Sequence, residues 1–343
     1  MNLIFKMKKT FLIILFISSI INGYSQTSKE YYDKGKAKCE LKDYEGAIAD
    51  YNKAIEINPK YEDAYCERGV TKLAIEDIDG AQQDFDKTIE INPKNSLAYY
   101  NIGIIKDFFK ENKEALESFT KAIEINPKFE KAYSNRGVSK GKLKDFEGAI
   151  IDYNKAIELD PKLTEAFYNR GWAKTKLLDY KGGIADYSKV IEIDPKNTKA
   201  FNARGLAKRK LKDFLGAIAD FSKIIEVDSS NAAAYSSRGY TKKELLNYEG
   251  AIADYNKAIE IEPNNEVTYV DRGFTKNKQK DYKGAITDYS KAIEIKPDYA
   301  IAYYNRGCSK INAGEKDSAC QDLKKSEELG QKEAALTIKE NCK

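Results

Sequence analysis

Residues 130–163, EKAYSNRGVSKGKLKDFEGAIIDYNKAIELDPKL, decide the fold, because the same 34-residue pattern can be laid on the chain nine times without a gap. A fixed period of this length is typical of a solenoid, in which each repeat packs on its neighbours. We predict repeats at residues 28–61, 62–95, 96–129, 130–163, 164–197, 198–231, 232–265, 266–299 and 300–333. In residues 334–343, the apolar Ala335, Leu336 and Ile338 predict a short capping helix.

Each repeat is expected to form two antiparallel helices, here numbered from position 1 at its first residue. The first helix has an aromatic residue at position 4 (Tyr133) and glycine at position 8 (Gly137). Asp145 at position 16 is a good N-cap for the second helix, and Pro161 ends that helix. Apolar residues at positions 20, 21, 24, 27 and 28 form its buried face. We expect the glycine to face Ala149 at position 20, so that the two helices approach closely.

An arginine at position 7 and an aspartate at position 23 occur together in seven repeats. Repeat 3 loses both, with Ile102 and Ser118, and repeat 1 has Lys34 with Asp50. This covariation predicts a partly buried ion pair inside each repeat, and a ligand role for the arginines is the competing interpretation. The predicted pairs are Arg68–Asp84, Arg136–Asp152, Arg170–Asp186, Arg204–Asp220, Arg238–Asp254, Arg272–Asp288 and Arg306–Asp322.

The composition argues against catalysis. Histidine is absent, which removes the usual general base, the common nucleophile pairs and the commonest metal ligand. The chain also lacks the G-x-S-x-G, P-loop, H-E-x-x-H and C-x-x-C motifs. We therefore predict that the protein is not an enzyme and needs no metal and no cofactor.

The first 25 residues read as a secretory signal peptide, with Lys6, Lys8 and Lys9 before an apolar run from Phe11 to Ile21. The run is too short to be a good membrane span. We predict export by a Sec-type signal to the periplasm or the medium. Those three lysines supply three of the four net positive charges, so residues 26–343 carry +1. A chain so close to neutral is not expected to bind nucleic acid.

Five cysteines in an exported protein predict a disulfide, and the odd number leaves at least one cysteine that is free or bonded to another molecule. Cys39 and Cys66 occupy positions 12 and 5 of neighbouring helices, an axial offset of about 10 Å that is too long for a bridge. Cys320, in the last repeat, and Cys342, in the cap, are the favoured pair. Cys308 with Cys320 is the alternative pairing.

The repeat resembles the tetratricopeptide repeat (TPR), whose pattern has aromatic residues, glycine, alanines and proline at these places. The resemblance covers residues 28–333. It implies an all-α, right-handed superhelical solenoid, with first helices lining a concave groove and second helices on the convex side. The family usually binds protein segments in that groove. This chain departs from the family pattern, which commonly has leucine at position 7 and tyrosine at position 11, by having mostly arginine at position 7 and lysine at position 11.

By the same resemblance, positions 2, 5, 6, 9, 12 and 13 of the first helices face the groove, and these positions vary most between repeats. Position 6 carries asparagines, whose amides can both donate to and accept from a partner backbone, as in an asparagine ladder of some superhelical members. Position 9 forms an apolar stripe, and position 13 a basic rim that would steer an acidic segment. The predicted groove residues are Tyr100, Asn101, Asn135, Val138, Lys142, Tyr168, Asn169, Trp172, Lys176 and Lys210.

Each groove feature has a structural alternative: solvated polar side chains, helix packing and a solvated charged face. The sequence therefore predicts a non-catalytic, exported scaffold that binds an extended protein or peptide segment. Binding of an envelope glycan or polymer through Tyr100, Tyr168 and Trp172 is the alternative. The sequence indicates neither the identity of the partner nor an oligomeric state.

Overall fold

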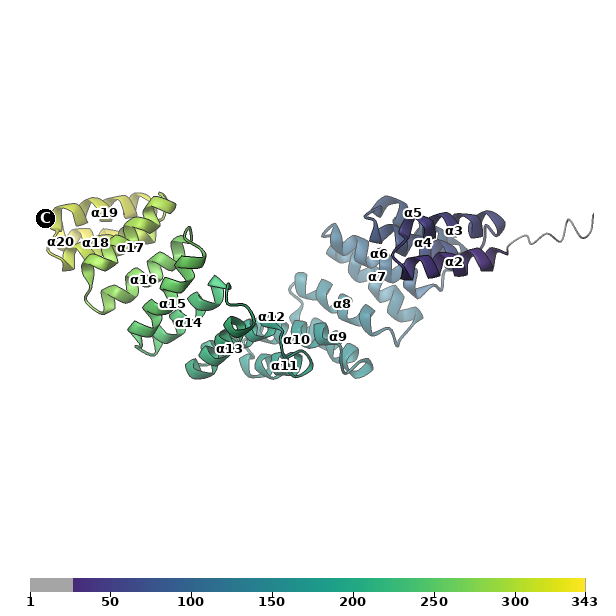
Figure 1. The fold of residues 1–343 in the computed structure, drawn as a ribbon, viewed down its shortest axis with the longest axis horizontal. Helices are drawn as coiled ribbons and strands as arrows, with labels where there is room; N and C mark the ends of the chain where they lie inside the picture. Colours follow the sequence, from purple (N-terminus) through teal and green to yellow (C-terminus); the bar gives the residue numbers. More distant parts are fainter. Residues whose placement is uncertain (1–26, 343) are drawn as a thin grey trace, which may run out of the picture. The chain divides into compact units, whose positions relative to one another are not determined.

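The computed structural model describes residues 27–342, and all regular secondary structure within them is helical, as predicted. The helices follow one another as tandem antiparallel pairs (Figure 1). None of the helices in this range is long and apolar enough to cross a membrane. The predicted signal peptide, residues 1–25, lies outside the described residues.

The chain divides into two compact units, Met1–Pro161 and Lys162–Lys343. The first unit contains α2 (Ser28–Glu40), α3 (Tyr44–Ile57), α4 (Glu62–Ala74), α5 (Ile78–Ile91), α6 (Ser96–Phe108), α7 (Asn112–Ile125), α8 (Glu130–Lys142) and α9 (Phe146–Leu159). The second unit contains α10 (Thr164–Lys176), α11 (Tyr180–Ile193), α12 (Thr198–Lys210), α13 (Phe214–Val227), α14 (Ala232–Glu244), α15 (Tyr248–Ile261), α16 (Glu266–Lys278), α17 (Tyr282–Ile295), α18 (Ala300–Asn312), α19 (Lys316–Glu328) and α20 (Glu333–Asn341).

The turn inside each pair follows from local hydrogen bonding. The predicted N-cap is confirmed in repeat 4, where the Asp145 carboxylate accepts a hydrogen bond of 2.9 Å from the Gly148 amide. The preceding residue, Lys144, has a left-handed backbone with φ of 67°. The Asp145 amide donates to the Lys140 carbonyl at 2.9 Å, which closes the end of the first helix as in a Schellman motif. Glycine is the usual residue at such a left-handed position, so lysine there is a departure from the common pattern.

The glycine at position 8 makes room for an aromatic ring. A Cβ atom built on Gly137 would lie 2.7 Å from Cε1 of Tyr153, at position 24 of the same repeat. The expected contact with position 20 is also seen, because a Cβ atom on Gly239 or Gly307 would lie 3.1 or 3.2 Å from the carbonyl oxygen of Ala251 or Ala319. At Gly137 the nearest atoms are instead those of the Tyr153 ring, which the sequence did not predict. Tyr153 is 1% exposed, so this ring is part of the core.

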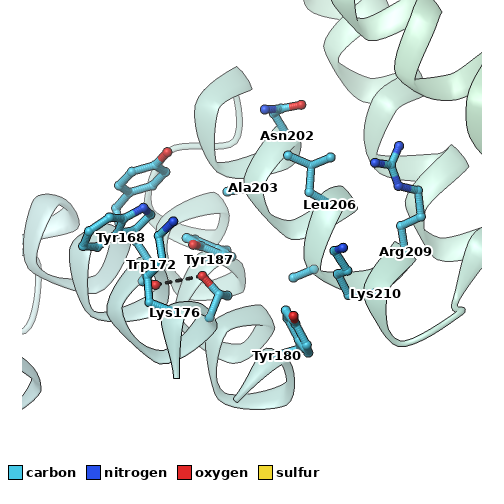
Figure 2. A pocket seen from close by; sticks show the side chains of 12 residues that line it. Tyr168, Trp172, Lys176, Tyr180, Tyr187, Asn202, Ala203, Leu206, Arg209 and Lys210 are labelled. Atoms are coloured by element: carbon cyan, nitrogen blue, oxygen red, sulfur yellow. Dashed lines mark hydrogen bonds between the residues drawn. The ribbon is translucent and has the colours of Figure 1, made fainter. Parts of the chain in front are cut away.

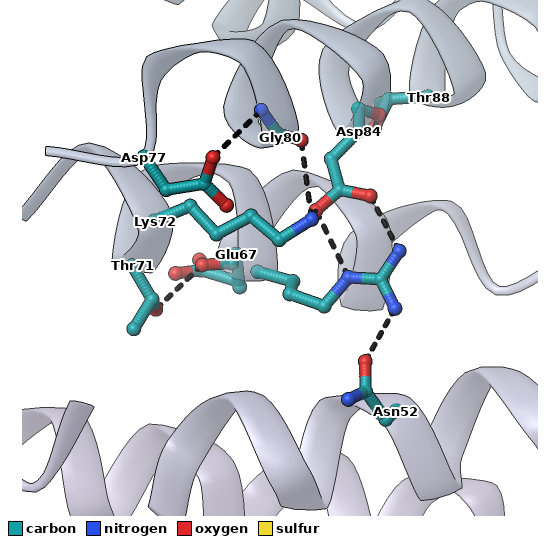
Figure 3. A network of polar contacts seen from close by, with 9 residues as sticks. Asn52, Glu67, Thr71, Lys72, Asp77, Gly80, Asp84 and Thr88 are labelled. Carbon is teal, nitrogen blue, oxygen red and sulfur yellow. Dashed lines mark hydrogen bonds and ion pairs between the residues drawn. The ribbon is translucent and has the colours of Figure 1, made fainter. Parts of the chain in front are cut away.

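The predicted arginine–aspartate pair is confirmed in all seven repeats that carry both residues. In repeat 4, Nε and Nη2 of Arg136 donate to the two carboxylate oxygens of Asp152 at 2.9 and 2.7 Å. Lys140, at position 11, binds the same carboxylate at 2.9 Å, which the sequence did not predict. Figure 3 shows the same arrangement in repeat 2, where Asp84 accepts from Lys72 and from the guanidinium of Arg68. Each aspartate of the seven arginine–aspartate pairs thus has two cationic partners, the arginine at position 7 and the lysine at position 11.

The same arginines also connect neighbouring repeats. The remaining Nη1 of Arg68 donates to the side-chain oxygen of Asn52, at position 25 of the repeat before it (Figure 3). In the second unit, Arg204, Arg238 and Arg306 donate in the same way to serine hydroxyls, at 2.9 to 3.0 Å. One guanidinium therefore joins the two helices of its own repeat and the last helix of the previous one.

Repeat 3 replaces this polar network with apolar packing. Ile102 stands where the arginine would be and joins a core cluster with Phe85 and Ile105. Because Ser118 replaces the aspartate at position 23, Lys106 forms its ion pair with Glu111 instead, at 2.7 Å.

The last repeat ends against α20, and the predicted disulfide between Cys320 and Cys342 is confirmed. It joins α19 to the residue that follows α20. Cys39, Cys66 and Cys308 are free, which excludes the alternative pairing of Cys308 with Cys320.

Candidate functional site

The second unit has a pocket between the first helices of repeats 5 and 6. It has a volume of about 400 Å³ and is lined by α10, α11 and α12. Tyr168 and Trp172 form one side, and Leu206, with Lys210 one turn further along α12, forms the other (Figure 2). Trp172 is 38% exposed and Leu206 37% exposed, so both side chains are accessible to a partner.

Several predicted groove residues come together in this pocket, namely Tyr168, Trp172, Lys176 and Lys210. Lys176 lies with Nζ 5.3 Å from the centroid of the Trp172 ring, a cation–π arrangement. The Thr175 hydroxyl donates to the Trp172 carbonyl at 2.7 Å and so is held by its own helix. The exposed polar groups of the pocket are therefore mainly cationic.

Other side chains of this pocket were not among the predicted groove residues, and Ala203 and Tyr187 are two of them. Ala203 occupies position 6, where repeats 3 to 5 have asparagine, and its small side chain leaves room beside Leu206. Tyr187, at position 24, belongs to the expected core face but also lines the pocket. Burial raises the pKa of Tyr187 to about 12 and also raises the pKa of Tyr168. Both phenols are therefore neutral over the physiological pH range.

Asn169 lies in a smaller neighbouring pocket of about 270 Å³, with Glu165, Tyr168, Asn197 and Lys199. Tyr168 lines both pockets, so the two are adjacent on the same face of α10. The predicted asparagine thus stands next to the aromatic side chains of repeat 5.

The predicted residues of the first unit are engaged within the protein. The Tyr100 ring packs against Phe119 and Phe129, with centroids 5.8 and 4.7 Å apart, and burial raises its pKa. Its hydroxyl accepts a hydrogen bond of 3.1 Å from Nδ2 of Asn135. Asn101 is only 6% exposed and donates from Nδ2 to the Leu97 carbonyl at 2.9 Å, so it differs from the exposed amide that we expected.

The basic rim differs between the two units. Lys142 forms an ion pair of 2.6 Å with Asp107, so its charge is balanced. Val138, on the same helix, is half-buried. In repeats 6 to 8, cations instead lie over rings of the next repeat: Arg209 over Tyr240 at 4.6 Å, and Lys243 over Phe274 at 5.1 Å.

Asp271, at position 6 of repeat 8, is the carboxylate beside these cations. Burial raises its pKa, while Lys243 and Arg209 partly oppose that shift. Asp271 occupies the place of the groove asparagines, and sequence analysis did not identify it as part of this face. The position of Asp271 in its repeat can be read from the sequence. Its neighbouring cations, Arg209 and Lys243, come from α12 and α14, and the repeat pattern does not indicate these contacts.

The first unit has an apolar pocket of its own, of about 410 Å³, lined by Leu73, Glu76, Ile78, Ile104, Ile105 and Phe108. Phe108 is 67% exposed and lies edge-on to Phe109, with ring centroids 5.3 Å apart. This pocket lies in repeats 2 and 3, and repeat 3 is the one in which Ile102 and Ser118 replace the arginine–aspartate pair.

Family models for TPR motifs match most of the helical region. The model described as TPR repeat matches residues 35–75 and 275–309. Two models described as tetratricopeptide repeat match residues 130–163 and 232–265, and residues 62–95, 97–129 and 164–197. No curated protein is significantly similar to the chain in sequence.

Several solved structures are similar to this chain. A tetratricopeptide repeat protein from Parabacteroides merdae is 23% identical over 71% of this chain and 96% of its own, with a TM-score of 0.55. The C-terminal part of a TPR repeat-containing protein from Cytophaga hutchinsonii is 19% identical over 69% and 97%, with a TM-score of 0.57. YrrB, described as a TPR protein with an unusual peptide-binding site, is 24% identical over 55% and 96%, with a TM-score of 0.48.

Proposed function

Because this chain is built from tetratricopeptide repeats, we propose that it is an exported, non-catalytic scaffold that binds extended protein segments on its first-helix face. The observation that carries the proposal is the pocket between α10 and α12, which is open to solvent and lined by Tyr168, Trp172 and Leu206. The first-helix positions that line this pocket carry different residues in different repeats, whereas the second helices repeat almost the same sequence. Variation confined to one face is typical of a surface adapted to a particular partner.

Export is supported by two independent features. Residues 1–25 have the charged start, apolar run and small polar end of a signal peptide. The Cys320–Cys342 disulfide fits an oxidising compartment, because cytosolic thiols are usually kept reduced. Cell fractionation, with the mass of the processed chain, tests this part: an intact N-terminus on cytoplasmic protein would contradict export.

An extended segment suits the spacing of the first helices. Packed helices lie roughly 8 to 10 Å apart, and an extended chain advances about 3.3 to 3.6 Å per residue. Equivalent positions on neighbouring first helices would therefore contact about every third residue of the segment. Asn169 would bond to its backbone while Trp172 and Leu206 contact its side chains.

Two exposed leucines of repeat 6 provide a matched test. Leu206, on α12, lines the pocket, whereas Leu215, on α13, is 73% exposed on the second helix. Residues 26–343 serve as bait for partners in a cell-envelope extract, and captured proteins are identified by mass spectrometry. We expect Leu206→Asp to abolish specific capture and Leu215→Asp to leave it unchanged. Capture that is lost only with Leu215→Asp would place binding on the second helices and contradict the proposal.

Glycan binding is the competing function, favoured by the exposed Trp172 ring. Tyr100 does not support it, because its ring is packed against Phe119 and Phe129. Retention on cell-wall material that Leu206→Asp and Trp172→Ala both abolish, without any captured protein, would favour the glycan over the peptide.

A further inference from the structure

The pocket between α10 and α12 has an unbalanced charge. Among the described residues that line it, Lys176, Arg209 and Lys210 are cationic and none is acidic. The adjacent pocket around Asn169 contains Glu165 as well as Lys199 and is therefore balanced. A bound segment would remove water from these cations, so its own charge matters to the binding free energy.

The lysine at position 13 has a carboxylate partner in repeat 4 but lies over an aromatic ring in repeat 5. Lys142 in repeat 4 and Lys176 in repeat 5 both stand at position 13. Lys142 is neutralised by Asp107 at 2.6 Å, whereas Lys176 lies over the Trp172 ring, 5.3 Å from its centroid. A ring face attracts the ammonium group but supplies no counter-charge. The positive field at repeats 5 and 6 is therefore available to an acidic ligand.

The two sides of the pocket present apolar groups. Trp172 and Leu206 face each other across it, and Ala203 adds no bulk between them. A volume of about 400 Å³ is in the range of small-molecule sites and holds one large side chain with its flanking backbone. The site thus combines an apolar cavity with a cationic edge.

Repeats 7 and 8 differ, which limits where an acidic segment would bind. Lys243 there pairs with Glu244 at 3.5 Å, and Asp271 is the carboxylate beside both Lys243 and Arg209. Asp271 therefore offsets part of the charge of Arg209, whereas Lys176 and Lys210 have no acidic residue among the described lining of the pocket. Like charges would repel an acidic segment from this part of the face. The charge pattern therefore favours repeats 5 and 6.

We infer that this pocket binds an acidic peptide segment, inserting one large aliphatic or aromatic side chain between Trp172 and Leu206 while flanking carboxylates pair with Lys176, Arg209 and Lys210. The inference rests on the proposed function and specifies the chemistry of the partner. An uncharged sugar could stack on Trp172 but would make no use of the three cations.

The test uses synthetic peptides and residues 26–343. The probe has a central leucine with three Asp or Glu residues on each side. Its controls replace the leucine by alanine, or every carboxylate by the corresponding amide. Binding is measured by calorimetry and by the fluorescence of Trp172, the single tryptophan. We expect the acidic leucine peptide to bind at least about tenfold more tightly than either control, and to weaken between roughly 50 and 200 mM salt.

A charge-matched pair of variants locates the effect. Lys176→Gln/Arg209→Gln/Lys210→Gln removes the cations of the pocket, and Lys189→Gln/Lys223→Gln/Lys257→Gln removes three from the second helices. We expect the first variant to lose at least about tenfold in affinity for the acidic peptide and the second to keep it. If both variants lose the same affinity for the acidic peptide, the effect comes from the net charge of the protein, and the inference is overturned.

Other outcomes separate the inference from the proposed function. Equal binding of the acidic and amide peptides, without salt dependence, would overturn the acidic chemistry while leaving peptide binding in place. If none of the three peptides binds, but a protein is captured from the extract and that capture is lost with Leu206→Asp, the acidic chemistry is again overturned while the proposed function stands. Failure of the peptides with a Trp172 response to envelope glycan fragments would overturn both.

Discussion

Arg136 holds Asp152 through two parallel hydrogen bonds of 2.9 and 2.7 Å, and the aspartate side chain is only 2% exposed. Two charged groups removed from water in this way stabilise the repeat only while they remain together. Lys140 shares the carboxylate, so the removal of Arg136 leaves one counter-charge in place.

We expect Arg136→Leu to lower the free energy of unfolding by about 3 kcal/mol, the lower end for a broken buried pair, because Lys140 still neutralises Asp152. Adding Asp152→Ser imitates repeat 3, with Ile102 and Ser118, and should cost less than the sum of the single changes. Urea unfolding followed by circular dichroism measures all four proteins. Simple additivity would mean that the two side chains do not stabilise each other.

The disulfide gives a second prediction. Cys320 and Cys342 are 22 residues apart, and closing a loop of this size stabilises the folded state by about 3 kcal/mol. We expect Cys342→Ser to increase hydrogen exchange in α19 and α20 while α14 to α17 stay protected. The control is Cys308→Ser, which removes a free, half-buried thiol and should leave the exchange of α20 unchanged.

Asp271 gives a dependence on pH. Burial raises its pKa in the folded protein, so folding favours the protonated carboxyl. Its contribution to stability is therefore more favourable below the unfolded pKa, near ~3.9, and is lost as the pH rises through the folded pKa. We expect Asp271→Asn to raise the urea midpoint at neutral pH and to have no such benefit near pH ~3. The exposed Glu249→Gln on α15 is the matched charge control, and an equal gain from it would point to net charge instead.

Gly137 gives a prediction about packing. Alanine is a better helix former than glycine by about 1 kcal/mol, but its Cβ would lie 2.7 Å from the buried Tyr153 ring. Overpacking typically costs about 1 to 3 kcal/mol, so Gly137→Ala is expected to be destabilising. Adding Tyr153→Leu removes the ring, and thermal unfolding should show a combined cost below the sum of the two. A Gly137→Ala variant more stable than the natural protein would show that the ring can move aside.

The sequence predicts the repeats and the arginine–aspartate pairs for the same reason, that each position is seen many times within one chain. The loss of both residues in repeat 3, with Ile102 and Ser118, is enough to indicate that the two positions are in contact. Lysine at position 11 never varies, so the sequence contains no exception that could indicate its partner. The link from Arg68 to Asn52 was missed because position 25 accepts several polar residue types.

The candidate site was predicted less completely, because identical residues at one repeat position have different neighbours. Asn101 bonds to its own helix, whereas Asn135 bonds to Tyr100 of the preceding repeat. Which of these occurs depends on side chains that the repeat pattern does not specify. The pocket beside Trp172 likewise depends on Ala203, a small residue that carries no chemical signal in the sequence.

The contacts from Arg238 and Arg272 to position 25 of the previous repeat have a consequence for changes in the number of repeats. Deletion of residues 232–265 by recombination would bring Arg272 to the place of Arg238, opposite Ser222, with the same donor and the same kind of acceptor. Duplication of that segment would recreate the contact once more. Genes encoding this protein could therefore gain or lose whole repeats in this region without redesign of the junction, whereas a junction at Ile102 would need an apolar neighbour.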